Sequence, residues 1–581
     1  MASTADTAAG AATEAAQPRY GVRKYSADLS AVGEPWLWGL GGALALGIIL
    51  VAGFLTMIFW NGVSTFWPKP IEVVTLTDGT VVAGEPTRSG VYRVGANVRE
   101  GLSPEALAMI DANDGFAHRV LYRSANFDLY GDDFRWVSDY EVAGVERPTD
   151  FFLLERQEWG PFVGRIAGLT LDGRERRLED YGYRELRRAQ AQARQRFEAI
   201  RHIEQKDIGR VNYYIERERL ALRRVQLRHG EDSEQYRAQQ PQTAARIAEL
   251  QQEFAAHQAR ITEIRTRDRG DWLLLEEVGG RSKQQLLSEV VRLYPANDLS
   301  GLQKIGIYLS RWKEFLTAEP REANTEGGVL PAIFGTVAMT LIMVVIVAPF
   351  GVITALYLRE YAKQGRIVSI VRVSVNNLAG VPSIVFGVFG LGFFAYTMGV
   401  SIDQLFYPER LPSPTFGTGG ILWSALTLAL LTVPVVIVAA EEALAAVPRS
   451  MREGSLACGA SKWQTIRRVV LPRAMPGIMT GLILAMARGA GEVAPLMLVG
   501  VVKLAPMLPV DGFYPFLHLE RSFMHLGFHI FDVGFQSRNS EAGKPMVFVT
   551  TLLLLFLIVT MNSSAIYIRN RLKRKFNVGQ F

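Results

Sequence analysis

The sequence predicts an all-α polytopic membrane protein with six transmembrane helices and an α+β domain outside the membrane. Three observations lead to this fold class. Six apolar runs are each long enough to cross a bilayer, which takes about 20 residues, and five of the six contain no charged residue. A long hydrophilic segment, 62–329, separates the first run from the second. Clusters of Lys and Arg recur on one side of the predicted spans.

The first predicted span is 36–60. Residues 1–30 are rich in Ala, Thr, Asp and Glu and lack apolar periodicity, which predicts a disordered tail. The uncharged run from Trp36 to Trp60 is too long for the core of a signal peptide, and no small-residue cleavage site follows it. We therefore expect an uncleaved anchor with tryptophans at both membrane interfaces.

Five further spans follow, and with the first they place both termini on one side of the membrane. Lys and Arg concentrate on that side, which predicts cytoplasmic termini, the tail 571–581 included, and an extracytoplasmic 62–329 segment. This pattern also accounts for much of the formal net charge of +6, so no nucleic-acid partner is expected. The five spans are 330–358, 378–400, 419–440, 474–502 and 546–568.

The extracytoplasmic segment divides by composition. Its first part alternates short apolar stretches, such as Ile71–Leu76, with Asp-Gly turns, which indicates β-strands. Residues 179–267 are rich in Arg, Glu, Gln and Ala with apolar residues at helical spacing, broken near Gly230. This pattern predicts an antiparallel coiled-coil hairpin inserted in the β-rich domain, with its second arm starting near Pro241. A strand is expected at Trp272–Glu277 and a helix near Ser282–Leu293.

The cytoplasmic loop 441–475 carries a motif. The sequence reads Glu453-Gly454-Ser455, then Gly459, Val469, Leu471 and Pro472. This spacing resembles the coupling motif of ABC importer permeases, which reads E-A-A-x3-G-x9-I-x-L-P. The resemblance implies an ABC permease fold over 330–570, in which Glu453, Gly459, Ala460, Leu471 and Pro472 couple the chain to a separate ATPase. Two short helices joined at a glycine fit this role, because glycine tolerates positive φ.

Two further strings resemble the PstA-type phosphate permease. They are Gly380–Gly387, reading GVPSIVFG, and Ala487–Pro495, reading ARGAGEVAP. The resemblance implies a subunit of an ATP-driven phosphate importer that forms half of the pathway in a bacterial inner membrane. It also implies a second permease of PstC type, an ATPase homodimer of PstB type and a periplasmic phosphate-binding protein of PstS type. No resemblance covers 62–329.

A charge pair stands out in the fifth predicted span. Arg488 lies twelve residues beyond Pro476, roughly 18 Å along a helix and therefore near mid-membrane. Glu492 follows four residues later, so both side chains are expected on one helix face. A charge at that depth costs at least about 2.5–3.5 kcal/mol and usually marks an ion path.

The guanidinium of Arg488 offers a planar fork that can donate two hydrogen bonds to phosphate, and Glu492 would keep it oriented and nearly neutralised. The alternative interpretation is a buried ion pair that only holds helices together. Ser383 is a second pathway candidate, because Pro382 frees a backbone carbonyl near the start of the third span.

Other chemistry is not expected of this chain. The sequence has no G-x-x-x-x-G-K-[ST] motif, so ATP and Mg²⁺ belong to a partner subunit, and the chain itself is not an enzyme and holds no cofactor. Its one cysteine, Cys458, rules out an intrachain disulfide. His518, His525 and His529 lack completing ligands and are expected at the surface rather than on a metal.

Three rival functions are open on the sequence alone. The transported ion is either phosphate or another tetrahedral oxyanion. A membrane receptor with an external sensing domain is disfavoured, because only a short tail follows Ile568. An intramembrane enzyme using Glu492 would need a second catalytic group in the membrane, and the spans contain none. For the external domain, we expect docking of the binding protein or of a matching domain on the partner permease.

Overall fold

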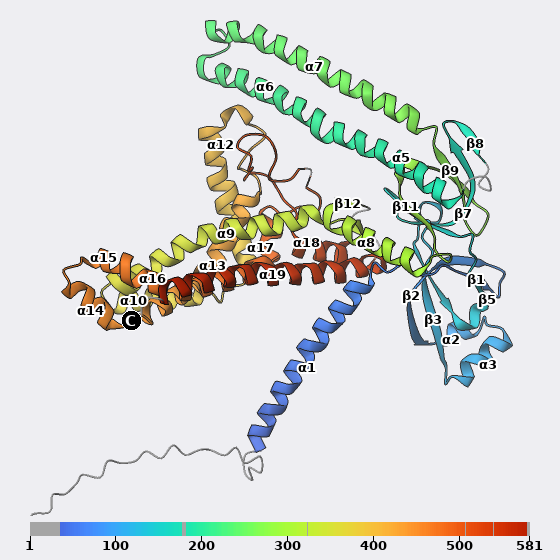
Figure 1. Cartoon of the computed structure of the whole chain (residues 1–581), viewed down its shortest axis with the longest axis horizontal. Helices are drawn as coiled ribbons and strands as arrows, with labels where there is room; N and C mark the ends of the chain where they lie inside the picture. Colours follow the sequence, from blue (N-terminus) through green and yellow to red (C-terminus); the bar gives the residue numbers. More distant parts are fainter. Residues whose placement is uncertain (1–34, 177–181, 322–323, 506, 538–539, 578–581) are drawn as a thin grey trace, which may run out of the picture. The chain divides into compact units, whose positions relative to one another are not determined.

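The computed structural model describes residues 35–176, 182–321, 324–505, 507–537 and 540–577 (Figure 1). The predicted tail at 1–30 lies outside these residues, and the predicted tail at 571–581 is described only to Asn577. The described residues divide into two units, one ending at Met57 and the other beginning at Ile58. The boundary falls within helix α1 (Pro35–Ser64), the first apolar run.

Six helices in the described part of the chain are long and apolar enough to cross a membrane, as predicted. They are α1; α9 (Leu330–Leu356) with η6 (Tyr357–Tyr361); α11 (Ser383–Phe389) with η7 (Gly390–Gly399) and α12 (Val400–Phe406); α13 (Ile421–Ala445); α15 (Lys462–Thr465) with η9 (Ile466–Val470) and α16 (Leu471–Gly491); and α19 (Ser540–Asn577).

The fifth span differs from its predicted limits. We expected 474–502, whereas the long helix runs over Lys462–Gly491. Pro472 does not start this helix, because the helix continues through it from η9, a π-helical segment. The wider π turn makes room for a proline ring that would otherwise collide with the carbonyl four residues earlier. The span therefore begins and ends earlier than its composition indicates.

The membrane core is built around α13, which packs against both α9 and α16. Two small-residue contacts bring α13 and α16 close together. A Cβ added to Gly477 or Gly481 would lie 2.6 Å or 2.4 Å from the side chains of Ala443 or Ala439. Small residues at such an interface let helix backbones approach in the absence of a hydrophobic driving force from water.

Between the first two spans, the described residues form two larger antiparallel sheets and a two-stranded one, β12 (Pro320–Arg321) with β13 (Glu326–Gly327). One has the order β4-β3-β2-β1-β5 and the other β10-β9-β7-β6-β11, with β8 paired to β7. Strands are confirmed near the expected Ile71–Leu76 and Trp272–Glu277 segments. The strands are β1 (Glu72–Leu76), β2 (Val81–Arg93), β3 (Phe116–Arg123), β4 (Phe134–Ser138), β5 (Val142–Glu146), β6 (Phe152–Arg156), β7 (Phe162–Leu171), β8 (Arg174–Arg176), β9 (Trp272–Glu276), β10 (Ser282–Leu286) and β11 (Val290–Pro295).

The prediction of a helix near Ser282–Leu293 is wrong. This segment forms β10 and β11, separated by a single 3-10 turn, and each strand pairs with the edge of the second sheet. The periodicity of such short apolar stretches does not distinguish a helix from a strand. Here the segment forms strands because β9 and β6 offer backbone hydrogen bonds to β10 and β11. The helix of this region comes later, as α8 (Gly301–Thr317).

The predicted helical hairpin is present. Its first arm is α5 (Tyr183–His202), η3 (Ile203–Ile208) and α6 (Gly209–His229), and α7 (Glu234–Asp268) returns beside it (Figure 1). Pro241 lies inside α7 rather than at its start, because the Ser233 hydroxyl accepts a hydrogen bond from the backbone N–H of Tyr236 and starts the helix earlier. Coiled-coil packing of the two arms stays a prediction.

Helix α6 also touches the loops between membrane helices. Arg224 pairs with the buried carboxylate of Glu409, in the 3-10 turn η8 (Pro408–Arg410), and Arg223 donates to the carbonyl of Leu411 at 2.7 Å. Closer to the start of α6, the ring of Tyr213 stacks on that of Phe513 with centroids 4.2 Å apart. The hairpin therefore rests on the loops that follow α12 and precede α19.

Candidate functional site

Arg488 and Glu492 pair in the structure at the end of α16. The Nε atom of Arg488 lies 3.6 Å from Oε1 of Glu492, with the side chains 38% and 22% exposed. They do not share a helix face, contrary to the prediction, because α16 ends at Gly491 and Glu492 has extended backbone with ψ of 135°. The carboxylate instead folds back across the helix end toward the guanidinium. A cation in the last turn is also favoured by the negative end of the helix dipole.

The break after α16 is short and bounded by proline. Glu492 and Val493 are non-helical, and α17 (Ala494–Val499) then begins with Pro495 in its first turn. Proline suits that position because it lacks the N–H that a first turn leaves unpaired. Broken helices of this kind form substrate and ion sites in transporters, since their ends present unpaired carbonyl and amide groups. The Arg488–Glu492 pair thus lies at a break between two helices.

The two strings predicted to line the path meet each other. Helix α11, which starts at the half-buried Ser383, packs against α17. The contact is made at Gly387, where an added Cβ would lie 2.8 Å from the Cα of Pro495. The sequence analysis did not assign Gly387 to the site, although a glycine within an otherwise apolar helical string indicates close backbone approach. Ser383 thus lies on the helix beside the break.

The segment predicted to couple the chain to an ATPase forms a tight corner. Helix α14 (Arg449–Ala457) carries the exposed Glu453 and ends at Cys458, and the next residue, Gly459, has φ of +84° as predicted. After Ala460, the Ser461 hydroxyl caps α15 by accepting from the N–H of Gln464. A hydrogen bond of 3.0 Å between the Ser455 and Thr465 hydroxyls holds the helices together. Leu471 and Pro472 then continue the helix as the first two residues of α16.

Arg452 attaches this corner to the membrane helices, and the sequence analysis missed it. Its guanidinium donates to the carbonyls of Leu444 (2.6 Å) and Val447 (3.0 Å) at the end of α13. It also pairs with Glu360 in η6, 3.1 Å away. A cation at a helix C-terminus satisfies carbonyls that have no partner within the helix. Movement of α14 would therefore pull on both α13 and α9.

The histidine prediction was wrong. His518, His525 and His529 are all buried. His518 lies between the carboxylates of Asp511 and Glu520, whereas His525 and His529 are buried because α18 (Leu526–Phe531) folds back against α9 and α19. The backbone N–H of Leu526 donates to the Thr336 hydroxyl of α9 at 2.9 Å. Burial lowers the pKa of His525 to about 4. A neutral ring is consistent with its Nδ1 atom, which accepts from the N–H of Gly527 at 3.1 Å.

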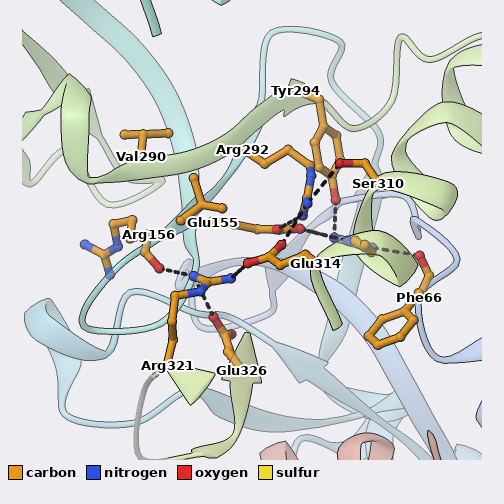
Figure 2. A network of polar contacts seen from close by, with 12 residues as sticks. Phe66, Glu155, Arg156, Val290, Arg292, Tyr294, Ser310, Glu314, Arg321 and Glu326 are labelled. Atoms are coloured by element: carbon orange, nitrogen blue, oxygen red, sulfur yellow. Dashed lines mark hydrogen bonds and ion pairs between the residues drawn. The ribbon is translucent and has the colours of Figure 1, made fainter. Parts of the chain in front are cut away.

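A buried ion-pair network joins the second sheet, α8 and the chain just after α1 (Figure 2). Glu155 of β6 pairs with Arg292 of β11 and with Arg311 of α8. Burial alone would raise the pKa of Glu155, but Arg292, Arg311 and Arg321 outweigh it and hold that pKa well below its usual range. Arg311 also donates to the carbonyl of Phe66 at 3.1 Å. The network extends through Glu314 and Arg321 to Glu326.

Known proteins are similar to this chain in the region of its membrane helices. Residues 347–574 match the family described as the inner membrane component of binding-protein-dependent transport systems. Together with the six spans, this match places the region in the permease class of ABC importers, and the chain is a multi-pass inner membrane protein.

Three curated relatives are similar to it. The probable ABC transporter permease YqgH of Bacillus subtilis (strain 168) is 35% identical over 204 residues, which are 34% of this chain and 62% of the relative. Phosphate transport system permease PstA 1 of Mycobacterium tuberculosis (strain CDC 1551 / Oshkosh) is 42% identical over 175 residues, 30% of this chain and 52% of the relative. YqgI of Bacillus subtilis (strain 168), a probable ABC transporter permease, is 29% identical over 264 residues, which are 44% of this chain and 84% of the relative.

The chain thus spans 62% and 52% of the length of the first two relatives. Over the matched segments the membrane domain is similar to PstA permeases, and a large domain is inserted between its first two spans.

Proposed function

We propose that this chain is a permease subunit of an ATP-driven importer of inorganic phosphate. The observation that carries the proposal is the Arg488–Glu492 pair at the break between α16 and α17, within a string that resembles phosphate permeases. The chain would form half of the pathway, with a PstC-type permease forming the other half. A PstB-type ATPase homodimer would supply ATP hydrolysis, and a PstS-type binding protein would deliver phosphate from outside. Both termini would be cytoplasmic.

The pair suits transient binding of an oxyanion. Arg488 retains partial exposure, which leaves its guanidinium free to contact an anion if the path passes beside the helix break. A planar guanidinium donates two parallel hydrogen bonds to phosphate oxygens. The Arg488–Glu492 separation of 3.6 Å is longer than a direct hydrogen bond, so an anion could replace the carboxylate partner at small cost. Glu492 would then return to Arg488 once the anion leaves, which prevents overly tight binding.

Coupling would enter at the corner around Gly459. Glu453 and Gly459 are exposed and available to a partner, whereas Ala460, Leu471 and Pro472 are half-buried and support the corner from behind. Because Arg452 ties α14 to α13 and η6, displacement of the corner would be transmitted into the bundle that holds α16. Mg²⁺ and ATP would bind the ATPase subunits.

The substrate is tested with the purified four-component complex in lipid vesicles. ATP hydrolysis and anion uptake are measured with the binding protein loaded with phosphate or offered sulfate. The proposal predicts stimulation and uptake with phosphate, and no response to sulfate at equal concentration. Stimulation by sulfate or another tetrahedral oxyanion, without a response to phosphate, would assign the permease to that ion instead.

For the extracytoplasmic domain, we propose docking of the binding protein or of a matching domain on the partner permease. The contacts of α6 with Glu409, Leu411 and Phe513 support this, because they place the hairpin beside the external loops of the permease. Deletion of residues 70–320 with the first span retained is the test. Uptake and binding-protein affinity equal to those of the intact chain would reject the idea.

A further inference from the structure

Helix α8 of the extracytoplasmic domain has an exposed apolar stripe. Leu302, Ile305, Leu309 and Leu316 are 82%, 46%, 60% and 38% exposed. At 3.6 residues per turn, these four positions fall within an arc of about 60° on one side of the helix. We call them the α8 stripe. Four large aliphatic side chains on one narrow face are unusual for a helix that faces only water.

The rest of α8 is occupied by protein. Ile307 packs into the core cluster that includes Ile71 and Tyr294 of the extracytoplasmic domain. Phe315 and Trp312 pack against the beginnings of α9 and α19. The spacing around the helix places the α8 stripe roughly opposite Ile307 and next to the Trp312 side. The stripe therefore faces away from its own domain, beside the ends of the membrane helices.

The position of α8 relative to the spans is fixed by direct contacts. The Tyr308 hydroxyl donates to the carbonyl of Val63, near the C-terminal end of α1, at 3.0 Å. The backbone N–H of Val329, the residue before α9, donates to the carbonyl of Phe315 at 2.8 Å. The helix thus touches the end of one span and the beginning of the next, which is the level of the lipid headgroups.

The side chains around the stripe match that level. Trp67 lies against Tyr308 with ring centroids 5.8 Å apart, and Phe66 lies edge-on to Trp312 at 5.1 Å. Tryptophan and tyrosine concentrate at the interface between hydrocarbon and water. Lys313 is exposed beside the stripe, and lysine extends its charge toward headgroups while its stem stays apolar.

We propose that α8 is an interfacial helix that rests on the lipid surface, with the α8 stripe inserted at the boundary between headgroups and acyl chains. Amphipathic helices of this kind lie in the plane of the interface. The ion-pair network links this lipid contact to the rest of the domain, because Arg311 of α8 binds both Glu155 of the sheet and the carbonyl of Phe66. The lipid contact would therefore fix the orientation of the extracytoplasmic domain, with its helical hairpin, relative to the membrane. The proposal does not depend on the transported ion.

The test uses the full chain in lipid nanodiscs with Cys458→Ser as background. Single cysteines at Leu302, Ile305 and Leu309 carry an environment-sensitive fluorophore, and the lipids carry a nitroxide quencher near the headgroup. The matched control is Ala255→Cys, at an exposed position on α7 of the hairpin. Labelled positions on the stripe are expected to emit at shorter wavelength and to lose emission when quencher lipid is added. The control position should do neither.

Two results would overturn the proposal. Water-like emission at all three stripe positions, equal to the control, would show that α8 stands clear of the lipid. Short-wavelength emission that quencher lipid does not reduce would show that protein covers the stripe. Because each label replaces one exposed side chain, the readout does not require a variant that removes the whole stripe.

Discussion

Replacing Gly459 by alanine should weaken docking of the ATPase partner through backbone strain alone. Gly459 has φ of +84°, and a Cβ added there would meet nothing within 4 Å. The substitution therefore causes no clash, and its cost is that of holding an L-residue in left-handed backbone, about 1–2 kcal/mol. Free of a partner, the corner can relax and relieve this strain. Docking then has to restore it, which lowers affinity by up to a factor of about 5–30.

The assay is binding of the purified ATPase subunit to vesicles that contain the permease pair. Gly454→Ala is the matched control, since it lies in α14 with nothing within 4 Å of an added Cβ. That change should leave docking intact and stabilise α14 by about 0.5–1 kcal/mol. Gly459→Asn should fall between, because asparagine tolerates left-handed backbone. Undiminished affinity of Gly459→Ala, or an equal loss with Gly454→Ala, would refute the argument from backbone conformation.

Three other substitutions test the packing and the buried charges, each through the thermal midpoint of the purified full chain. Gly387→Ala should lower the free energy of unfolding by about 1–3 kcal/mol, because its Cβ would lie 2.8 Å from the Cα of Pro495. Gly392→Ala, in the same span, should be nearly neutral because its Cβ would meet nothing within 4 Å, and equal midpoints for the two variants would contradict the close approach. Arg311→Met should cost about 3–5 kcal/mol by leaving Glu155 buried with fewer cations, and a midpoint unchanged at pH 7 would contradict the network. His525→Gln should flatten the pH dependence: the folded pKa of His525 is about 4 against an ordinary 6.5, so its stabilising effect is complete above pH 6.5 and is lost as pH falls toward 4; an identical pH profile in the variant would show that His525 does not titrate as its burial requires.

The features that could be predicted from the sequence are those that depend on residues close to one another along the chain. Long apolar runs define the six spans because composition alone decides whether a helix can enter lipid. The left-handed backbone at Gly459 follows from the glycine and the spacing around it. Helical periodicity likewise predicted the hairpin, although Ser233 rather than Pro241 sets where α7 begins.

Features that depend on distant parts of the chain could not be predicted. Glu155, Arg311 and Arg321 come together only through the fold of two sheets and a helix, and no local pattern links them. Burial of His525 depends on its segment folding back onto Thr336 of α9. The break at Glu492 could have been anticipated from Gly491 and Pro495, but four-residue spacing of opposite charges favoured a continuous helix.

The central claim is that Arg488 lies on the phosphate path, and uptake by Arg488→Gln tests it most directly. Uptake of radiolabelled phosphate is measured in vesicles in which assembly of the complex is verified, beside Arg366→Gln as a control that removes an exposed arginine at the start of α10 (Arg366–Leu378). The account predicts loss of uptake in Arg488→Gln with assembly intact, partial uptake in Arg488→Lys, which keeps the charge but not the planar fork, and normal uptake in the control. Normal uptake by Arg488→Gln, or loss of assembly in its place, would contradict the claim and leave the Arg488–Glu492 pair as a structural ion pair.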